Sequence, residues 1–537
     1  MDTVDVWNYA DLWERVADRR PDQEALVWGK DRRSWRDFDR AASGLAASFL
    51  DAGLRQGAKV AAYLYSQPEY LETYFAAFKA SLVPVNVNYR YRAGEVHYIL
   101  DNADAEAVVF GSSFTDLVNE IRDRLPGVRL WVCVDDAGTG CPDWATPYER
   151  AAAPSDRPHV PWDRSPDDLF FLYTGGTTGM PKAVMWRQDD VIRLLSVGLG
   201  MRAMLGEPVP ETMADWERQL LDAGNPPPKL TPACPLMHGT GLFTAYSALL
   251  GGGTVVLLAS NKYDAEELLD TTEREHVNAW AIVGDPFARP VADALDAHPG
   301  RWDLSSLLGV TSSGAMWTES VKQRILAHAP HLVLADAFSS SEAVGMAASV
   351  STGDSAASTA QFAVGERTQV LRDDGTPVTP GSGESGMLAV HDFLPQGYYK
   401  DPEKTARTIV EYDGVRWLLS GDIATVDADG IVHVSGRGSM CINTAGEKVF
   451  VEEVEEALKT YPGVQDAIVV GVPDPQWGQA VTAIVQADQP VDEAAVIAHV
   501  KERLAAYKAP KRVLQAEVPR SPSGKADFQR AQQMLTA

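Results

Sequence analysis

The chain has 537 residues, of which 45% are hydrophobic and 23% charged, so it is long enough for several domains of ordinary globular composition. With 74 acidic against 48 basic side chains its net charge is −26, which on average excludes nucleic acid and anionic membranes as partners but not an anionic small ligand. The 4 cysteines form no CxxC pair and no apolar run approaches the roughly 20 residues of a membrane span, so we expect no structural zinc, disulfide framework or transmembrane helix.

The first part of the chain predicts an α/β fold. Apolar residues at helical spacing follow Trp35, and short apolar runs typical of buried strands alternate with helical segments. Strand alternating with helix indicates a mainly parallel sheet. The predicted segments are a helix over 32–54, a strand over 60–65, a helix over 66–81, a strand over 83–89 and a strand over 167–174.

The alternation breaks at 202–230, which holds GEPVP, a short helical run and NPPPK, and we interpret this segment as an inserted surface excursion or lid. Strand-like runs then resume, and the last of them form a β-rich segment. A second alternation of helix and strand begins near Gly438. We therefore predict a large N-terminal domain over 1–437, of mainly parallel sheets with helices and a β-rich subdomain, and a small mobile C-terminal α+β domain over 438–537.

A loop rich in Gly and Thr follows the strand at 167–174, in the stretch YTGGTTGMPKAVMW. Its glycines expose backbone N–H groups and its threonines supply hydroxyls, which suits phosphate oxygens, and Lys182 adds a cation. The P-loop pattern is GxxxxGK[ST], whereas Met180 and Pro181 here separate Gly179 from the lysine, so a standard P-loop NTPase is excluded. By itself, the loop is compatible with phosphate binding or with a structural turn.

Four further segments follow the loop in order: SSSEAVG, LLSGDIATVDADGIVHVSGR, NTAGEKVFVEEVEEAL and PRSPSGKAD. Together with YTGGTTGMPKA they resemble the core motifs of the adenylate-forming superfamily, which includes acyl-CoA synthetases, peptide-synthetase adenylation domains and luciferases. The likeness extends from the Arg32 segment to Lys525, and five ordered motifs are far more specific than one. It implies that a carboxylate attacks the α-phosphate of ATP in the presence of Mg²⁺, and that a thiol, usually that of coenzyme A, then displaces AMP.

The resemblance also implies a nucleotide site. Glu342 matches the motif glutamate that would hold Mg²⁺ together with Thr174, although an acid is also common in the first turn of a helix. Asp422 would accept the ribose hydroxyls and Arg437 would lie near them, with turn capping and a surface salt bridge as the respective structural alternatives. Ser341 would contact the α-phosphate. The remaining expected ATP contacts are Gly175, Gly176, Thr177, Thr178, Gly179 and Lys182 around the phosphates, and Ser313, Gly314, Ala315, Asp336, Ala337, Phe338 and Ser339 on the adenosine side.

Lys525, within SPSGKAD, matches the superfamily's catalytic lysine, whereas a lone lysine near a C-terminus is usually surface decoration. It would bridge the acyl carboxylate and the α-phosphate and neutralise transition-state charge. Because it lies on the small domain, that domain would close for the first step. By analogy it would then swing away, so that Gly446, Glu447 and Lys448 face the site for thiolation.

His238, in CPLMHGTG, matches a histidine on the acyl side of related ligases, with a buried structural histidine as the alternative. We take it, with Lys525 and Glu342, as a candidate catalytic residue. The segment 236–244 offers no acidic residue to pair the amine of an amino acid, and its apolar character favours a fatty or bulky alicyclic acid over acetate. The expected acyl pocket comprises His238, Thr240, Gly241, Leu242, Phe243, Met316 and Trp317.

Several positions depart from the residues usual in the superfamily. Phe338 and Ser339 stand where Tyr-Gly is common, so the stacking face is kept but a hydroxyl is lost. These departures leave adenylation intact in our interpretation and bear on the details of domain rotation and thiolation. The other replacements, at glycine, proline or hinge positions, are Ala183, Ala445, Val451 and Ser439.

The predicted function is that of an ATP-dependent carboxylate–CoA ligase for a medium- or long-chain fatty acid or a bulky alicyclic or steroid side-chain acid, because the loop and the 202–230 excursion resemble those of bacterial ligases for such acids.

Two alternatives stay open. One is acyl transfer to a carrier protein, although the chain stops soon after Lys525 without a carrier domain; the other is a non-catalytic nucleotide-binding homologue, against which Lys525, Glu342 and Asp422 argue. The acidic start is unlike a signal peptide, so we expect a cytoplasmic enzyme that uses ATP, Mg²⁺ and coenzyme A, and we leave a homodimer open.

Overall fold

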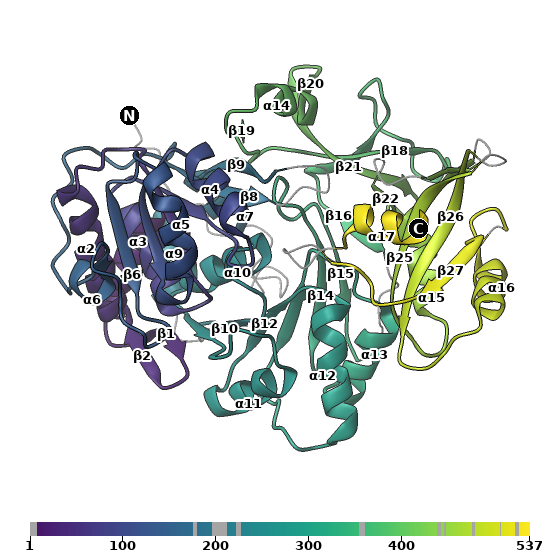
Figure 1. Cartoon of the computed structure of the whole chain (residues 1–537), viewed down its shortest axis with the longest axis horizontal. Coiled ribbons are helices and arrows are strands. Elements are labelled where there is room, and N and C mark those ends of the chain that lie inside the picture. Colours follow the sequence, from purple (N-terminus) through teal and green to yellow (C-terminus); the bar gives the residue numbers. More distant parts are fainter. Residues whose placement is uncertain are drawn as a thin grey trace. The chain divides into compact units, whose positions relative to one another are not determined.

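The computed structural model of the chain describes residues 8–174, 180–195, 212–221, 227–353, 360–437, 442–444, 447–474, 478–504, 506–520 and 526–536. These residues form two compact units, the first within 8–353 together with 391–409, and the second within 360–390 together with 410–536 (Figure 1). Over the described ranges, no helix combines the length and the apolar character needed to cross a bilayer.

One sheet of the first unit has the strand order β19-β9-β8-β4-β3-β5-β6-β7. The strands from β8 to β7 pair in parallel, whereas β9 and β19 add antiparallel pairs at one edge. The strands are β3 (Lys59–Tyr63), β4 (Val83–Asn86), β5 (Ala105–Gly111), β6 (Leu130–Val134), β7 (Thr146–Pro147), β8 (Leu169–Thr174), β9 (Lys182–Arg187) and β19 (Gly397–Tyr398). The helices along this part of the chain are α3 (Pro68–Lys79), α4 (Ala93–Asn102), η1 (Ser112–Phe114), α5 (Thr115–Ile121), η2 (Arg122–Arg124), α6 (Tyr148–Ala151) and α7 (Gln188–Leu194).

Both faces of this sheet are buried, and successive side chains of a strand alternate between them. Val60 and Ala62 of β3 belong to the core that contains α3, whereas Ala61 and Tyr63 pack in a second core with α4 and α5. A strand that is covered on both sides has no polar face, which explains why VAAYLY and LFFLY are continuous apolar runs.

The second sheet of the first unit has the strand order β15-β14-β13-β12-β10-β11-β1-β2 and is parallel except at its two edges. Helices α11 to α13 cover one face, and the opposite face contributes to the core that contains α3 and α10. The strands are β1 (Glu24–Trp28), β2 (Asp31–Ser34), β10 (Lys229–Pro232), β11 (Thr254–Leu257), β12 (Ala279–Ile282), β13 (Gly309–Ser312), β14 (Val333–Phe338) and β15 (Ala347–Ser351). The helices are α1 (Tyr9–Arg19), α2 (Trp35–Asp51), α9 (Met213–Leu221), α10 (Gly239–Leu250), α11 (Ala265–Glu275), α12 (Asp285–Ala297) and α13 (Glu319–His328), and α14 (Pro402–Thr408) follows β19.

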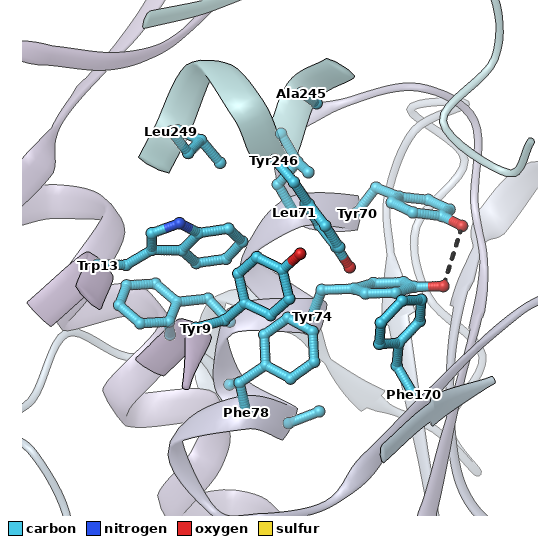
Figure 2. Packing of buried hydrophobic residues seen from close by; sticks show 14 of the residues in the cluster. Tyr9, Trp13, Tyr70, Leu71, Tyr74, Phe78, Phe170, Ala245, Tyr246 and Leu249 are labelled. Carbon is cyan, nitrogen blue, oxygen red and sulfur yellow. Dashed lines mark hydrogen bonds between the residues drawn. The ribbon is translucent and has the colours of Figure 1, made fainter. Parts of the chain in front are cut away.

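Aromatic side chains of α1, α3 and α10 form the centre of the layer between the two sheets. Figure 2 shows Tyr9, Trp13, Tyr74, Phe78 and Tyr246 packed against one another, with the ring centroids of Tyr9 and Tyr246 4.7 Å apart. Aromatic pairs in such geometries add about 0.5–1.5 kcal/mol each beyond the burial of their area. The layer therefore holds both sheets against one shared core and fixes the orientation of α10.

The second unit contains an antiparallel sheet of order β17-β18-β21-β22-β16, with β20 paired to β21, and a C-terminal sheet of order β24-β23-β26-β25, with β27 parallel to β26. In the C-terminal sheet, Val469 packs under α15 and α16 whereas Ile468 packs under α17, so helices cover both faces. The elements of the first sheet are β16 (Gln361–Val364), β17 (Thr368–Leu371), β18 (Ser385–His391), β20 (Ile409–Tyr412), β21 (Val415–Val426) and β22 (Val432–Arg437). Those of the second are β23 (Ile442–Thr444), β24 (Glu447–Val449), α15 (Val451–Lys459), β25 (Val464–Asp474), β26 (Gly478–Ala487), α16 (Glu493–Arg503), β27 (Arg512–Gln515) and α17 (Phe528–Thr536).

The structure confirms the predicted α/β class, with mainly parallel sheets in the first unit and a C-terminal α+β part. The predicted strands at 60–65, 83–89 and 167–174 correspond to β3, β4 and β8, and the helices at 32–54 and 66–81 correspond to α2 and α3. The domain boundary at 437/438 stays a prediction, because β22 ends at Arg437 and residues 438–441 lie outside the described part of the chain.

Within the predicted 202–230 excursion, helix α9 is packed on the body of the first unit. The Nε1–H of Trp216 donates to the backbone oxygen of Leu250 at 3.0 Å, and Leu220 lies against Gly252. Arg19 of α1 forms an ion pair with Glu217. This part of the excursion is therefore fixed near the C-terminal end of α10, whereas 202–211 and 222–226 lie outside the described residues.

Gly241, in the first turn of α10, lies so close to the preceding loop that a side chain does not fit. A Cβ atom there would lie 2.5 Å from the backbone oxygen of Pro235 and 2.8 Å from that of Cys234. Backbone cannot move aside as the end of a flexible side chain can, so glycine is required at this position.

We predict that Gly241→Ala lowers the free energy of unfolding by up to about 2 kcal/mol, because an overpacking cost at the upper end of about 1–3 kcal/mol, expected against fixed backbone, exceeds the helix-propensity gain of about 1 kcal/mol. Urea denaturation would measure the change. Gly94→Ala in α4, where nothing lies within 4 Å of the added Cβ, is the control and should be neutral or stabilising. Equal effects of the two substitutions would contradict the packing argument.

Candidate active site

The candidate residues of the first unit lie where strands end and loops begin. β8 ends at Thr174, β13 ends immediately before Ser313, and β14 ends at Phe338. His238 is the N-cap residue of α10, which follows β10. Open α/β sheets bind ligands outside the carboxyl ends of their parallel strands, because the connecting loops and helix N-termini meet there. The strand directions thus gather the predicted segments at ligand-binding ends of the two sheets.

The side chain of Asn86, at the end of β4, connects two of these segments. Its Oδ1 accepts a hydrogen bond from the Tyr173 N–H at 2.6 Å, and its Nδ2 donates to the backbone oxygens of Tyr173 at 3.0 Å and of Met237 at 2.7 Å. Asn86 is 3% exposed, so water does not replace these contacts. The amide therefore joins the residue before Thr174 to the residue before His238.

Thr240 connects the acyl-side segment to the predicted adenosine side. Its Oγ1–H donates to the backbone oxygen of Ser313 at 3.2 Å, and the same Oγ1 lies 3.6 Å from a Cβ placed on Gly314. Gly314 has φ +95°, in the left-handed region, and both it and Ala315 are exposed. A ligand with a flat face can reach the backbone here without meeting a side chain.

A buried charge cluster lies beneath the end of β14. Lys322 Nζ donates to Asp336 Oδ2 at 3.2 Å, and Ser312 of β13 lies beside Asp336 in the strand register. Burial raises the pKa of Asp336 to about 6, with the charge on Lys322 opposing the rise and that on Asp285 adding to it. Asp285 itself accepts the N–H and hydroxyl of Thr318. The predicted nucleotide contacts at the ends of β13 and β14 therefore rest on a network of partnered polar groups.

Glu342 lies in a loop that is tied to the first sheet. Trp186 of β9 donates its indole N–H to the backbone oxygen of Ser341 at 2.9 Å, and the hydroxyl of Tyr398 in β19 donates to Glu342 Oε1 at 2.7 Å. Within the loop, Ser340 Oγ accepts the N–H groups of Glu342 and Ala343. The carboxylate of Glu342 is thus half-buried and held on one of its oxygens.

Lys182 forms an ion pair with Asp401, the N-cap residue of α14. Each carboxylate oxygen of Asp401 accepts a different hydrogen bond: Oδ1 accepts from the Lys404 N–H, and Oδ2 accepts from Lys182 Nζ. These hydrogen bonds lower the pKa of Asp401 below its usual range. The lysine that follows the Gly-rich loop is therefore held by a neighbouring carboxylate at one end of β9.

The residues predicted for an acyl pocket separate into core and boundary positions. Leu242, Phe243 and Trp317 are buried in hydrophobic cores, and Trp317 packs among α11 to α13. His238 and Met316 are half-buried. The core positions shape the wall behind α10 and β13, and their contact with an acid stays a prediction.

In the second unit, Asp422 of β21 and Arg437 of β22 are directly paired across an antiparallel ladder, so the structure brings these two predicted ribose contacts together. Asp422 is buried. Glu447 and Lys448 belong to β24. The other predicted residues lie outside the described part of the chain, namely Gly175, Gly176, Thr177, Thr178, Gly179, Ser439, Ala445, Gly446 and Lys525.

Sequence reasoning missed four residues that hold the site together: Asn86, Trp186, Tyr398 and Asp401. A polar Asn within the apolar run VPVNVNY is a signal for Asn86, because a buried amide needs partners. Tyr398 and Asp401 lie in GYYKDPEKT, where only the Asp-Pro start of a helix is readable locally. Their contacts with Glu342 and Lys182 depend on the fold.

Comparison with known proteins shows the family and the fold of the chain. The family model described as AMP-binding enzyme matches residues 13–399, and that described as AMP-binding enzyme C-terminal domain matches residues 453–525. The chain is similar to a medium/long-chain-fatty-acid–CoA/3-oxocholest-4-en-26-oate–CoA ligase of Mycolicibacterium smegmatis, at 37% identity over 97% of this chain and 95% of that protein. It is also similar to a 3-oxocholest-4-en-26-oate–CoA ligase of Rhodococcus rhodochrous, at 38% identity over 97% and 94%. Among solved structures, the anthranilate CoA ligase AuaEII in complex with anthranoyl-AMP shares the fold, with a TM-score of 0.83, 21% identity and coverage of 100% and 99%.

We predict that Asn86→Ala lowers the free energy of unfolding by about 2–4 kcal/mol, since it leaves one N–H and two carbonyl groups buried without this partner. Asn86→Asp should also destabilise, because a carboxylate would face two carbonyl oxygens. Asn88→Ala is the control: Asn88 is also buried, but its side-chain oxygen accepts from Arg90, two residues along the chain. Urea denaturation would measure the free energy of unfolding of the three variants. If Asn88→Ala lost as much free energy of unfolding as the two Asn86 variants, the role of Asn86 would be contradicted.

We predict a pH dependence of stability that is specific to Asp336. Burial raises the pKa of Asp336 to about 6 in the folded state, whereas an unfolded aspartate titrates near 4. The folded state therefore binds the proton more tightly, and the stabilisation that this gives is fully present below about pH 4. That contribution is lost as the pH rises through 6. Relative to Asp336→Asn, the wild type should therefore lose about 2–3 kcal/mol between pH 4 and pH 7. Denaturation curves at several pH values would measure this, and a difference that does not vary with pH would contradict it.

Proposed function

Because the chain belongs to the AMP-binding enzyme family, whose two models match residues 13–399 and 453–525, we propose that it is an AMP-forming carboxylate–CoA ligase for an apolar acid. The acid class is a medium- or long-chain fatty acid or a bulky steroid side-chain acid. The observation that carries this proposal is the near full-length identity of 37–38% to ligases named for such acids. Transfer of the acyl group to a carrier protein is the alternative outcome.

The proposed reaction has two steps. A carboxylate oxygen of the acid bonds to the α-phosphorus of ATP while the bond to pyrophosphate breaks, which yields acyl-AMP. The sulfur of coenzyme A then bonds to the acyl carbon, its proton is released and AMP leaves. Because the acid is ionised at neutral pH, the first step requires alignment and charge stabilisation rather than a general base.

We assign the polyphosphate to the loop that begins at Thr174 and ends at Lys182. When bound with ATP, Mg²⁺ would neutralise phosphate charge, held by Glu342 and Thr174. The donor set fits such an ion, because Glu342 supplies a half-buried carboxylate and Mg²⁺ bound with nucleotides takes only one or two protein carboxylates. Ser341, next to Glu342, would contact the α-phosphate.

On the adenosine side, Ser313 to Ala315 and the segment Asp336 to Ser339 would receive the base. Gly314 and Ala315 are exposed and carry little or no side chain, which supports the approach of a flat ring. Asp422 and Arg437 would bind the ribose, and their direct pairing across β21 and β22 supports a shared role.

The acid would enter beside His238 and Thr240, with Gly241, Leu242, Phe243, Met316 and Trp317 shaping an apolar wall. The packing of α10 against the aromatic layer between the sheets supports a rigid wall rather than an adaptable one. A rigid apolar wall suits an acid that contributes binding energy through buried hydrocarbon, about 25 cal/mol per Å².

Lys525 would bridge the acid and the α-phosphate in the first step, and Gly446, Glu447 and Lys448 would face the thiol in the second. This division requires that the small domain, which we place at 438–537, changes its position between the steps. We also propose that the enzyme works in the cytoplasm, and a homodimer remains an expectation that gel filtration would test.

A panel of acids tests the proposal directly. Purified enzyme, ATP and Mg²⁺ would be mixed with fatty acids of short, medium and long chain length, with a steroid side-chain acid, or with amino acids. Each mixture would be tested with and without coenzyme A. We expect AMP release with coenzyme A and an apolar acid, together with the acyl-CoA product. Adenylate formation without any coenzyme A-dependent product would favour the carrier-protein alternative, and no ATP turnover with any acid would favour a non-catalytic role.

We predict that Lys525→Ala lowers the rate of acyl-AMP formation by at least about a hundredfold while ATP binding persists, because a cation is lost where transition-state charge develops. Acid-dependent pyrophosphate release measures the rate, and calorimetric titration measures ATP binding. Lys511→Ala, elsewhere in the C-terminal part, is the control. An unchanged rate of acyl-AMP formation in Lys525→Ala would refute the assignment.

A further inference from the structure

The short segment 397–405 contacts both charged side chains that we place at the polyphosphate. It begins with β19, which pairs with β9, and continues into the first turn of α14. From it, Tyr398 reaches Glu342 and Asp401 reaches Lys182. Neither Tyr398 nor Asp401 belongs to any of the predicted motifs.

The strand register explains how one segment reaches both residues. Tyr398 lies opposite Val184 of β9, and the backbone of β9 pairs Lys182 with Thr174 of β8. Tyr399 N–H continues the ladder by donating to the Ala183 oxygen at 2.9 Å. Through Val184 of β9, Tyr398 is therefore aligned with Leu172 of β8, close to Thr174 at the start of the predicted phosphate loop.

The segment itself is rigid. Gly397 has φ +134°, and a Cβ atom there would lie 2.4 Å from the side chain of Thr405, so only glycine fits at this position. Thr405 Oγ1 accepts the Tyr398 N–H at 2.9 Å and donates to the backbone oxygen of Asp401 at 2.9 Å. Lys404 Nζ lies 3.8 Å from the centroid of the Tyr398 ring. The phenol ring is thus held by its backbone and by a cation on its face.

We propose that Tyr398 is a positioning residue for Glu342, and this rests on the proposed function. Its hydroxyl donates to Glu342 Oε1 and restricts the rotation of the carboxylate, which leaves Oε2 to the metal–nucleotide complex that Glu342 would hold. A hydroxyl partner that orients a metal-binding carboxylate typically contributes ten- to a hundredfold in metal affinity or activity. Asp401 acts in parallel by holding Lys182 at the edge of the same sheet.

Tyr398→Phe removes the hydroxyl and leaves the ring, its packing and the backbone ladder. Tyr399→Phe is a matched control, because Tyr399 also donates its hydroxyl to a carboxylate, that of Asp104 at 2.7 Å, in the next position of the same segment. Both variants lose one phenol–carboxylate hydrogen bond, so thermal denaturation compares their folding. Only Tyr398→Phe removes a contact with Glu342.

Two measurements test the proposal. Electron paramagnetic resonance titration of Mn²⁺ into the enzyme with ATP reports metal affinity without turnover, and acid-dependent pyrophosphate release reports kcat. For Tyr398→Phe we expect about tenfold weaker Mn²⁺ binding and about tenfold lower kcat, with the KM for the acid unchanged. For Tyr399→Phe we expect values within about twofold of wild type.

Equal Mn²⁺ affinity in Tyr398→Phe and wild type would overturn the proposal, as would an equal loss in both variants. The wild-type control separates this failure from failure of the proposed function. If wild type releases no pyrophosphate with any acid, the ligase assignment fails, whereas if wild type is active and Tyr398→Phe matches it, only the positioning role fails.

Discussion

The amide of Asn86 is the constraint on which the rest of the candidate site depends. A parallel sheet places its loops at one edge, but it does not fix how far each loop reaches beyond that edge. Asn86 does so for two loops at once, because its three hydrogen bonds join the last residues of β8 to the segment that leads into α10. The start of the predicted phosphate loop and the start of the acyl-side helix therefore share one buried reference point. The aromatic layer behind α10 makes that reference point rigid.

Much of the fold was predictable because its physics is local. Continuous apolar runs such as VAAYLY identify strands that are covered on both faces, and helical spacing after Trp35 identifies α2. The resemblance of the ordered motifs also predicts that Thr174, Glu342 and Asp422 bind one nucleotide, and this stays a prediction. The helices α1 and α17 were not predicted, although each has an apolar stripe that packs on a core.

The residues that support the site were less accessible to sequence reasoning, because their partners are remote in the chain. Trp186 contacts the loop at Ser341, and Tyr398 contacts Glu342, through pairings of strands that no local pattern encodes. The ion pair of Lys182 with Asp401 likewise joins a loop end to a helix cap. Lys182 was interpreted as an accessory cation for phosphate, and the structure adds that a carboxylate accompanies it. Incoming phosphates would therefore compete with an existing partner, which weakens the lysine's attraction at a distance and favours a ligand that also engages the rest of the loop.

The position of β19 in the chain has a consequence for the order of synthesis. The first unit receives 391–409 only after the chain has passed through 360–390, which belongs to the second unit. Synthesis runs from the N-terminus and early segments fold first, so β8, β9 and Glu342 emerge from the ribosome before β19, the second strand that pairs with β9. Until β19 has been made and added to the sheet edge, Glu342 has no phenol beside it and Lys182 has no cap carboxylate. An unfinished chain can thus contain Lys182 and Glu342 without the segment that contacts both of them, and these contacts form only in chains translated into α14.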